Sequence, residues 1–277
     1  MNAVLLRQYN ELKAKLEAAK GSLSTTSPLL QELKSRPESI LIRARMTPDP
    51  WQMDLLRSRA GRLLLLCSRQ TGKSQTAAAL ALITAILEPN ALVLLLSPTL
   101  RQSGELFRQK LLPLWRALGC PFKLAQTQLT LDLANGSRVI SLPESEEGIR
   151  GFSGVTLLVI DEASRVSDSL YYAVRPMLAV SRGRLMALST PWGKRGWFYE
   201  EFTGPHVWKR VQITAEQCPR IGKDFLEEER LSLGDRWFRQ EYLCAFEETI
   251  DAVFTEADIV GATDDAPPPL FLQRGLK

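Results

Sequence analysis

The 277-residue sequence has one histidine, His206, and four widely separated cysteines, Cys67, Cys120, Cys218 and Cys244. No two cysteines form a CxxC pair. We therefore expect neither a cysteine–histidine metal site nor a disulfide framework, and reduced thiols in a cytosolic compartment fit best. The sequence also lacks a signal peptide and any apolar stretch near the roughly 18 residues of a membrane span. We predict a soluble intracellular protein that has no membrane partner.

A dominant charge is also missing. The chain has 35 basic and 31 acidic residues, a formal net charge of +4, and no basic block stands out. Contact with nucleic acid is therefore permitted but not indicated by charge alone. The hydrophobic fraction of 45% and the charged fraction of 24% are ordinary for a globular protein. The length fits one large α/β domain, or a domain with a small appendage.

The most informative local pattern is CSRQTGKSQT, residues 67–76. It follows the apolar run at 63–66 and precedes a helical pattern at 74–87, the strand–loop–helix order that a phosphate-binding loop requires. The backbone N–H groups of such a loop, together with the N-terminus of the next helix, point at one anionic centre. Lys73 would reach the β- and γ-phosphates of ATP, and the Ser74 hydroxyl would be a ligand of Mg²⁺.

One position departs from the usual phosphate-loop pattern. That pattern begins with a glycine five residues before Gly72, and this sequence has Cys67 there. The ending GKS also fits a surface turn, so the loop alone leaves both interpretations open. If the loop does bind ATP, the further contacts are expected from Ser68, Arg69, Gln70, Thr71, Gly72 and Gln75.

A second pattern supplies the other half of such a site. Residues 155–160, VTLLVI, form a continuous apolar run of the kind found in a strand buried on both faces. Asp161 and Glu162 follow at its carboxyl end, where open α/β sheets place ligands. Asp161 suits the Mg²⁺ shell, and Glu162 is placed to polarise a water as general base. Two solvated acids are the alternative, but the loop about ninety residues upstream favours a nucleotide hydrolase site.

The alternation of strands and helices predicts an α/β fold with a mostly parallel sheet covered on both faces. We expect strands at 63–66, 91–96, 155–160 and 184–188, a hairpin within 121–142 that turns at Asn135-Gly136, and helices at 74–87, 100–118 and 168–180. The predicted organisation is an N-terminal helical segment 1–45 with a helix at 3–20, a P-loop ATPase core 46–203, a largely helical unit 204–250 and a tail 251–277.

Six segments carry a family resemblance: DPWQ at 49–52, SRQTGKS at 68–74, GIRGFSG at 148–154, LLVIDEA at 157–163, LSTPWG at 188–193 and, more weakly, RWFRQEYLCAF at 236–246. Their wording and order resemble the ATPase domain of the large terminase subunit, the DNA-packaging motor of tailed phages. Arg69 and the missing first glycine are typical of that family. The resemblance implies a P-loop NTPase of the additional-strand, catalytic-glutamate type, in which residues 204–250 form a small helical lid.

The resemblance also implies a function and its partners. It implies an ATP- and Mg²⁺-dependent motor that drives double-stranded DNA into the procapsid. Its partners would be the portal protein, the small terminase subunit and its own copies in a ring, a pentamer, in the host cytoplasm and transiently on the procapsid. Another P-loop translocase or helicase, distinguished by strand separation, is the alternative. A non-catalytic module with a relic pocket is a third hypothesis.

A nuclease activity is not expected from this sequence. A full-length large terminase subunit carries a second, metal-binding nuclease domain after the ATPase domain. Only about two dozen residues follow Phe254, too few for such a domain. We therefore predict ATP hydrolysis without DNA cleavage.

Two residues upstream of the loop are candidates for base recognition. The Gln52 amide can pair with both the donor and the acceptor edge of adenine, and the resemblance makes Trp51-Gln52 the adenine-recognition motif. A helix start after Pro48 and Pro50, with Trp51 in the core, is the alternative. Within the loop, Arg69 could neutralise γ-phosphate charge in cis, and its alternative is a surface salt bridge.

Arg150 is the candidate arginine finger. It lies in a glycine-rich segment before the Asp161 strand, and the resemblance places a trans-acting arginine in the matching segment. Arg101 and Arg165 are rivals, and a structural ion pair is the alternative for Arg150, since fingers act in cis in some enzymes and in trans in others.

Ser189-Thr190 is the last candidate pair. It ends the strand expected beside the Asp161 strand, where hydroxyl groups can sense the γ-phosphate or the attacking water. The resemblance assigns this motif to the coupling of hydrolysis with movement. A simple turn before Pro191 is the alternative.

Overall fold

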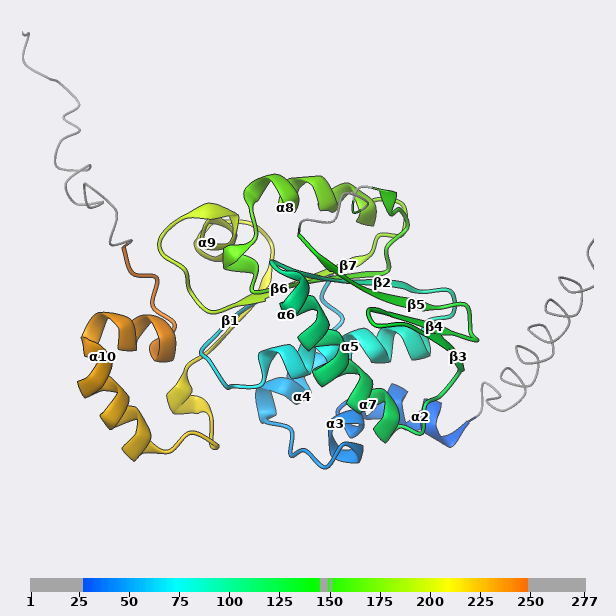
Figure 1. The fold of residues 1–277 in the computed structure, drawn as a ribbon, viewed down its shortest axis with the longest axis horizontal. Coiled ribbons are helices and arrows are strands. Elements are labelled where there is room, and N and C mark those ends of the chain that lie inside the picture. The colour runs from blue at the N-terminus through cyan, green and yellow to red at the C-terminus, as the bar shows by residue number, and fades with distance from the viewer. Residues whose placement is uncertain (1–26, 145–148, 150, 249–277) are drawn as a thin grey trace, which may run out of the picture.

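The computed structural model describes residues 27–144, 149 and 151–248. An eight-stranded sheet forms its centre, in the spatial order β3–β4–β5–β2–β6–β7–β1–β8 (Figure 1). The strands are β1 (Arg62–Cys67), β2 (Leu92–Ser97), β3 (Lys123–Gln126), β4 (Thr130–Leu133), β5 (Arg138–Pro143), β6 (Leu157–Asp161), β7 (Arg184–Ser189) and β8 (Lys209–Ile213). The helix predicted at 3–20 and the tail predicted at 251–277 lie outside the described residues.

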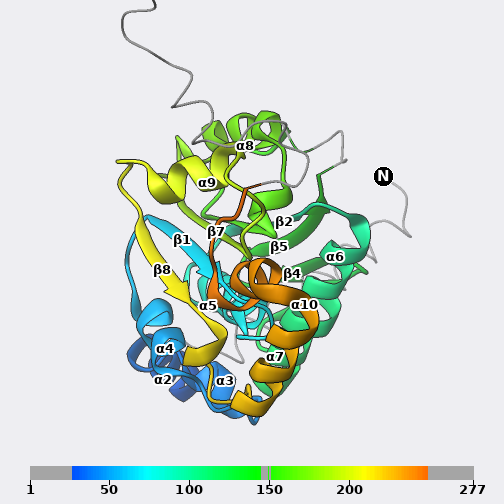
Figure 2. The same ribbon diagram turned by 90° about the vertical axis from the view of Figure 1, so that its left-hand side faces the viewer.

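Helices cover both faces of the sheet (Figures 1 and 2). The α-helices are α2 (Pro28–Ser35), α3 (Ser39–Arg43), α4 (Pro50–Arg57), α5 (Lys73–Leu87), α6 (Leu100–Glu105), α7 (Leu112–Ala117), α8 (Asp168–Val174), α9 (Gly196–Thr203) and α10 (Lys223–Leu243). A π-helix, η1 (Leu106–Leu111), joins α6 to α7, and the short 3-10 helices are η3 (Ala163–Arg165), η4 (Arg175–Leu178) and η5 (Ala215–Gln217). Helices α2 to α7 pack on one face, and α8 and α9 pack on the other.

The leucine-rich strands explain this two-sided arrangement. In β1, Leu63 and Leu65 pack in the core cluster of the α5 face, whereas Leu64 and Leu66 pack in that of the α8–α9 face. All four are at most 1% exposed. Because successive side chains point to opposite faces of a strand, a continuous apolar run gives both faces a hydrophobic surface.

The topology confirms the predicted mostly parallel sheet. Strands β5, β2, β6, β7, β1 and β8 are parallel to their neighbours in that order, and the β3–β4 and β4–β5 pairs are antiparallel. The additional strand is β7, which lies between β1 and β6. The carboxyl ends of these three strands therefore meet at one edge, the place where open α/β sheets bind ligands.

The predicted strands and hairpin correspond to observed elements, but two strands were missing from the prediction. The strands expected at 63–66, 91–96, 155–160 and 184–188 are β1, β2, β6 and β7, and the expected hairpin is β4–β5. Strands β3 and β8 were not predicted from the sequence. Strand β8 lies in the segment 204–250, which was expected to be largely helical, and it pairs with β1 at the edge of the sheet.

The mixed sequence of β8, KRVQI, explains the omission, because an edge strand is partly exposed and need not be apolar. The domain boundary expected at residue 203 thus separates β8 from the sheet in which it pairs with β1.

Two predicted helices are interrupted. The helix expected at 100–118 contains the π-helix η1, which directly precedes α7. The second residue of α7 is Pro113, which has no N–H to donate. The α-helix expected at 168–180 ends at Val174, and the tighter 3-10 helix η4, with Pro176 as its second residue, follows from Arg175. None of the helices in the described part of the chain has the length and apolar character needed to cross a bilayer.

Candidate nucleotide site

The loop between β1 and α5 has the backbone of a tight anion-binding turn. Gly72 caps α5 with φ of 92° and ψ of 16°, a left-handed conformation that favours glycine. A Cβ atom at this position would lie 2.9 Å from Nε2 of Gln52. The Thr71 hydroxyl donates to the carbonyl of Ser68 at 3.0 Å and closes the loop. The backbone therefore turns here into the N-terminus of α5, where the free N–H groups can bind phosphate.

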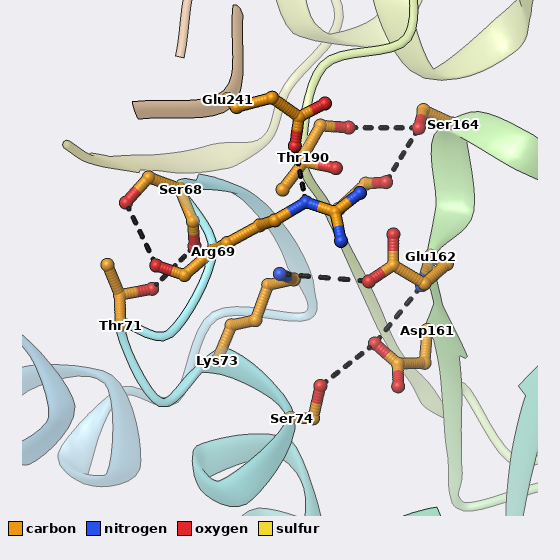
Figure 3. Close-up of polar contacts among 11 residues, drawn as sticks. Ser68, Arg69, Thr71, Lys73, Ser74, Asp161, Glu162, Ser164, Thr190 and Glu241 are labelled. Atoms are coloured by element: carbon orange, nitrogen blue, oxygen red, sulfur yellow. Dashed lines mark hydrogen bonds and ion pairs between the residues drawn. The ribbon is translucent and has the colours of Figure 1, made fainter. Parts of the chain in front are cut away.

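Four predicted site residues converge beside this loop (Figure 3). Nζ of Lys73 lies 3.7 Å from Oε1 of Glu162, and the Ser74 hydroxyl donates to Oδ1 of Asp161 at 3.3 Å. All four line a cavity of about 380 Å³, together with Arg69, Gln70, Gly72 and Gln75 from the loop. The loop after β1 and the end of β6 thus form one pocket, although 87 residues separate Ser74 from Asp161.

Charge in this pocket favours a cation beside the acids. Burial raises the pKa of the Asp161 carboxyl to about 6, and the neighbouring charge of Glu162 adds to the shift. A bound cation would favour the ionised form of Asp161. A hydroxyl and a carboxylate are the hard oxygen donors that Mg²⁺ takes from a protein when nucleotide phosphates and waters complete its shell. The residues present therefore fit a magnesium nucleotide.

Glu162 is held in an unusual backbone conformation. Its φ of 50° and ψ of 43° are left-handed, which costs free energy for a residue with a side chain. Its amide donates to Oδ1 of Asp161 at 3.1 Å. The chain thus turns sharply after β6, and the Glu162 side chain, which lines the pocket, is 24% exposed. A water could reach it there, as a general base requires.

Arg69 is paired with the helix α10. Its Nε donates to Oε2 of Glu241, and its backbone amide donates to the Glu241 carbonyl at 3.4 Å. Figure 3 shows the guanidinium passing above Lys73 toward Glu162. The position beside the pocket agrees with the predicted role, and the ion pair agrees with the alternative of a salt bridge.

Gln52 lies against the loop with its amide already bonded. Its Oε1 accepts from the Asp49 backbone amide at 2.8 Å, a capping-box contact at the start of α4, and its Nε2 donates to the Thr76 hydroxyl at 2.8 Å. Trp51 packs partly buried against the core of the α5 face. A helix therefore starts at Pro50, and it places Gln52, the expected base-recognition residue, beside Gly72.

The remaining candidates fall into two groups. Oγ of Ser164, just after Glu162, lies 2.7 Å from Oγ of Ser189 and donates to the Thr190 carbonyl at 2.9 Å, so the ends of β6 and β7 are joined. Arg150 lies outside the described residues. Of its two rivals, Arg165 stacks over the Trp192 ring at 3.8 Å, and Arg101 is exposed.

Two parts of the site were not predicted from the sequence. Gln102, Glu105 and Lys110 from α6 and η1 form a second wall of the pocket, and Nε2 of Gln75 donates to the Lys110 carbonyl at 3.4 Å. Their position after β2, the strand beside β6, is a signal that could have suggested them. Arg220 binds the loop from a distant segment, and no local pattern indicates it.

Comparison with known proteins gives a family and a fold. A family model for the N-terminal part of the terminase large subunit, T4likevirus-type, matches residues 64–260. The large terminase subunits of Thermus virus P23-45 and Escherichia phage T5 are 26% and 27% identical, over 77% and 80% of this chain and 51% and 53% of their own lengths. The chain thus spans about half the length of these relatives.

Solved structures share the fold. The large terminase ATPase domain of Thermus phage P74-26 matches with a TM-score of 0.66 and 23% identity, covering 76% of this chain and 99% of that domain. The large terminase of a second, thermophilic bacteriophage, in complex with ATP-gamma-S, matches with a TM-score of 0.56 and 15% identity, over 72% of this chain and 52% of that one.

Proposed function

Because the chain belongs to the family of T4-like terminase large subunits, as their N-terminal part, we propose that it hydrolyses ATP to drive double-stranded DNA into a procapsid. The convergence of Lys73 and Ser74 with Asp161 and Glu162 on one pocket carries this proposal. Two separate sequence patterns, each with its own chemistry, meet at the edge of the sheet where a nucleotide binds in this class of fold.

The loop residues would hold the triphosphate. The α5 N-terminus and the backbone N–H groups of residues 68–74 would surround the β- and γ-phosphates, with the Lys73 amine beside them. The Ser74 hydroxyl and the Asp161 carboxylate would hold Mg²⁺, which neutralises phosphate charge when bound. The large terminase of the thermophilic bacteriophage was solved in complex with ADP and with ATP-gamma-S, which supports nucleotide binding by this fold.

Glu162 would act as the general base. It would accept a proton from a water whose oxygen forms a bond to the γ-phosphorus, while the bond from that phosphorus to the β–γ bridging oxygen breaks. The bridging oxygen leaves with the electron pair as part of ADP, and inorganic phosphate is the second product. Since Lys73 lies 3.7 Å from Glu162, the triphosphate would draw the amine toward the phosphates and free the carboxylate.

Coupling to movement would begin at the joined ends of β6 and β7. Ser164 contacts both Ser189 and Thr190, so a change at the γ-phosphate could reach the segment after β7 through two hydrogen bonds. We further propose Arg150 as the arginine that reaches a neighbouring subunit's nucleotide in a ring. The portal protein, the small terminase subunit and duplex DNA are the proposed partners, in the host cytoplasm and on the procapsid.

Replacing Glu162 by glutamine tests the assignment directly. Glu162→Gln keeps the size of the side chain but removes the base, so turnover should fall about 10²–10⁴-fold while ATP binding is retained. Phosphate release and binding of a fluorescent ATP analogue measure the two quantities. Glu228→Gln, an exposed change on α10, is the control and should leave both unchanged. Undiminished turnover in Glu162→Gln would remove Glu162 from this role.

A further inference from the structure

We infer that Arg220 is a positioning residue that holds the phosphate loop in its nucleotide-binding conformation, an inference that rests on the proposed function. Arg220 lies between η5 and α10, 149 residues after the loop residue that it contacts. Neither the pattern of the loop nor that of the Asp161 strand includes it. One of its hydrogen bonds nevertheless ends on the backbone of the phosphate loop itself.

The guanidinium makes three hydrogen bonds at once. Nη1 and Nη2 donate to Oδ1 and Oδ2 of Asp49, both at 2.8 Å, and Nη2 also donates to the Thr71 carbonyl at 3.1 Å. Asp49 is only 6% exposed. A two-pronged arginine–carboxylate pair has a fixed plane, so the pair with Asp49 fixes the direction in which the third hydrogen bond points.

That third bond sets the orientation of one peptide plane. In a planar trans peptide the carbonyl of Thr71 and the N–H of Gly72 point in opposite directions. Holding the carbonyl toward Arg220 therefore holds the N–H of Gly72 away from Arg220. Gly72 lines the pocket, and its N–H is one of the donors that a phosphate-binding turn needs.

The next peptide group, that between Gly72 and Lys73, is held by a second set of contacts. Gln52, in the first turn of α4, donates to the Thr76 hydroxyl, and that hydroxyl donates to the Gly72 carbonyl at 3.0 Å. Asp49 and Gln52 are themselves joined by the capping-box contact at 2.8 Å. Arg220 is therefore the outer end of a continuous network that holds the two peptide groups around Gly72.

A contact of this kind should act on the phosphates rather than on the base. If Arg220 orients the Gly72 N–H, its loss weakens every ligand that places phosphate in the loop, with or without adenine. If Arg220 acted only through α4 and Trp51, ATP would be affected and an inorganic polyphosphate would not. The two probes distinguish these effects.

The test compares Arg220→Ala with Arg43→Ala. Arg43 makes two hydrogen bonds to Glu32 between α2 and α3, and its side chain is 43% exposed against 48% for Arg220. Dissociation constants for ATP and inorganic tripolyphosphate are measured by displacement of a fluorescent ATP analogue. Arg220→Ala should weaken both ligands about tenfold, with kcat at saturation within about threefold of the wild type. Arg43→Ala should change neither constant.

Two further variants separate positioning from folding. Arg220→Lys keeps the charge but cannot make all three bonds in one plane, so its affinity should lie between those of the wild type and Arg220→Ala. Asp49→Asn should weaken tripolyphosphate as Arg220→Ala does, and the double variant should be no weaker than either single one. Melting temperatures identify any variant that fails to fold. If Arg220→Ala fails to fold, the affinity of Arg220→Lys for tripolyphosphate tests the positioning role instead.

Amide hydrogen exchange without nucleotide gives a reading that does not depend on ATP. Residues 67–74 should exchange faster in Arg220→Ala than in Arg43→Ala. Equal exchange and equal affinities in these two variants would overturn the positioning role, as would a loss confined to ATP. If the wild type binds neither ATP nor tripolyphosphate, the proposed function is wrong. The exchange of residues 67–74 in the two variants would still test whether Arg220 holds the loop.

Discussion

The edge of the sheet and the α10 unit, defined as residues 215–243, are built in different ways. At the edge, the strands that carry the loop and the acids are packed on both faces, and Leu63 to Leu66 are at most 1% exposed. The α10 unit has its own small core of Ala215, Leu226 and Phe238, and it leaves Leu231 88% exposed and Trp237 41% exposed. One region is fixed by burial, and the other is held by few apolar contacts.

The α10 unit contacts the nucleotide site through two arginine–carboxylate pairs. It supplies the carboxylate in one pair and the arginine in the other. Glu241 of α10 binds Arg69 of the loop, and Arg220, at the start of the unit, binds Asp49 beside the loop. Close packing resists small displacements, whereas an ion pair can exchange its anion for another one. If phosphate binds in the pocket, we therefore expect its charge to act on α10 more readily than on the strands.

The largest expected difference in stability is between alanine substitutions of a leucine in the sheet and of a leucine in the α10 unit. Leu65→Ala in β1 removes a fully buried side chain and should lower the free energy of unfolding by about 2–5 kcal/mol. Leu231→Ala in α10 makes the same chemical change at an exposed position and should stay within about 0.5 kcal/mol of the wild type. Urea unfolding followed by circular dichroism measures both. Similar losses in the two variants would mean that burial does not distinguish the edge of the sheet from the α10 unit.

A backbone change should give a smaller loss that is confined to the α10 unit. Gly234 interrupts α10 with φ of 75° and ψ of 161°, a region open almost only to glycine, and no atom lies within 4 Å of a Cβ built there. Gly234→Ala therefore adds strain without a clash and should cost about 1–3 kcal/mol.

Hydrogen exchange locates the effect of this substitution. Faster exchange is expected in residues 223–243, and β1 and β6 should keep their protection. An unchanged variant, or one in which the strands lose protection as well, would show that α10 and the sheet are not separable in this way.

The residues whose chemistry depends on local order were predictable from the sequence. Lys73 and Ser74 follow a strand and begin a helix, and Asp161 and Glu162 end a buried strand, so their meeting follows from strand order in a parallel sheet. Apolar runs predicted β1, β2, β6 and β7 for the same reason. Strand β8 was not predicted because its sequence mixes polar and apolar residues at a partly exposed edge, and only its pairing with β1 defines it.

The contacts made by long polar side chains were not predictable. From the sequence, Arg69 could contact a phosphate or form a salt bridge, and only the position of α10 shows that Arg69 pairs with Glu241. Gln52 could read a base or support a helix start, and the structure shows that Thr76 and Asp49 already use its amide. Arg220 had no local signal, because its partners lie 149 and 171 residues away.

The smallest expected effect tests whether charge links α10 to the site. Glu241→Gln removes the carboxylate that neutralises Arg69 while keeping the side-chain shape, so the loop gains one net positive charge. Affinity for ATP and tripolyphosphate should rise about two- to fivefold at low salt, and the gain should shrink in about 0.5 M salt because exposed charges are screened.

Glu247→Gln provides a matched control for this prediction. The Arg239–Glu247 pair has side chains 57% and 14% exposed, against 58% and 12% for Arg69–Glu241, but neither of its residues lines the pocket. The two substitutions therefore remove equivalent charges from equivalent surroundings, and only one is next to the phosphates. Displacement of a fluorescent ATP analogue at two salt concentrations compares them. An equal response from both variants would mean that α10 contributes general charge rather than a specific contact, and a loss of affinity in Glu241→Gln would mean that the pair supports the loop instead of competing with the ligand.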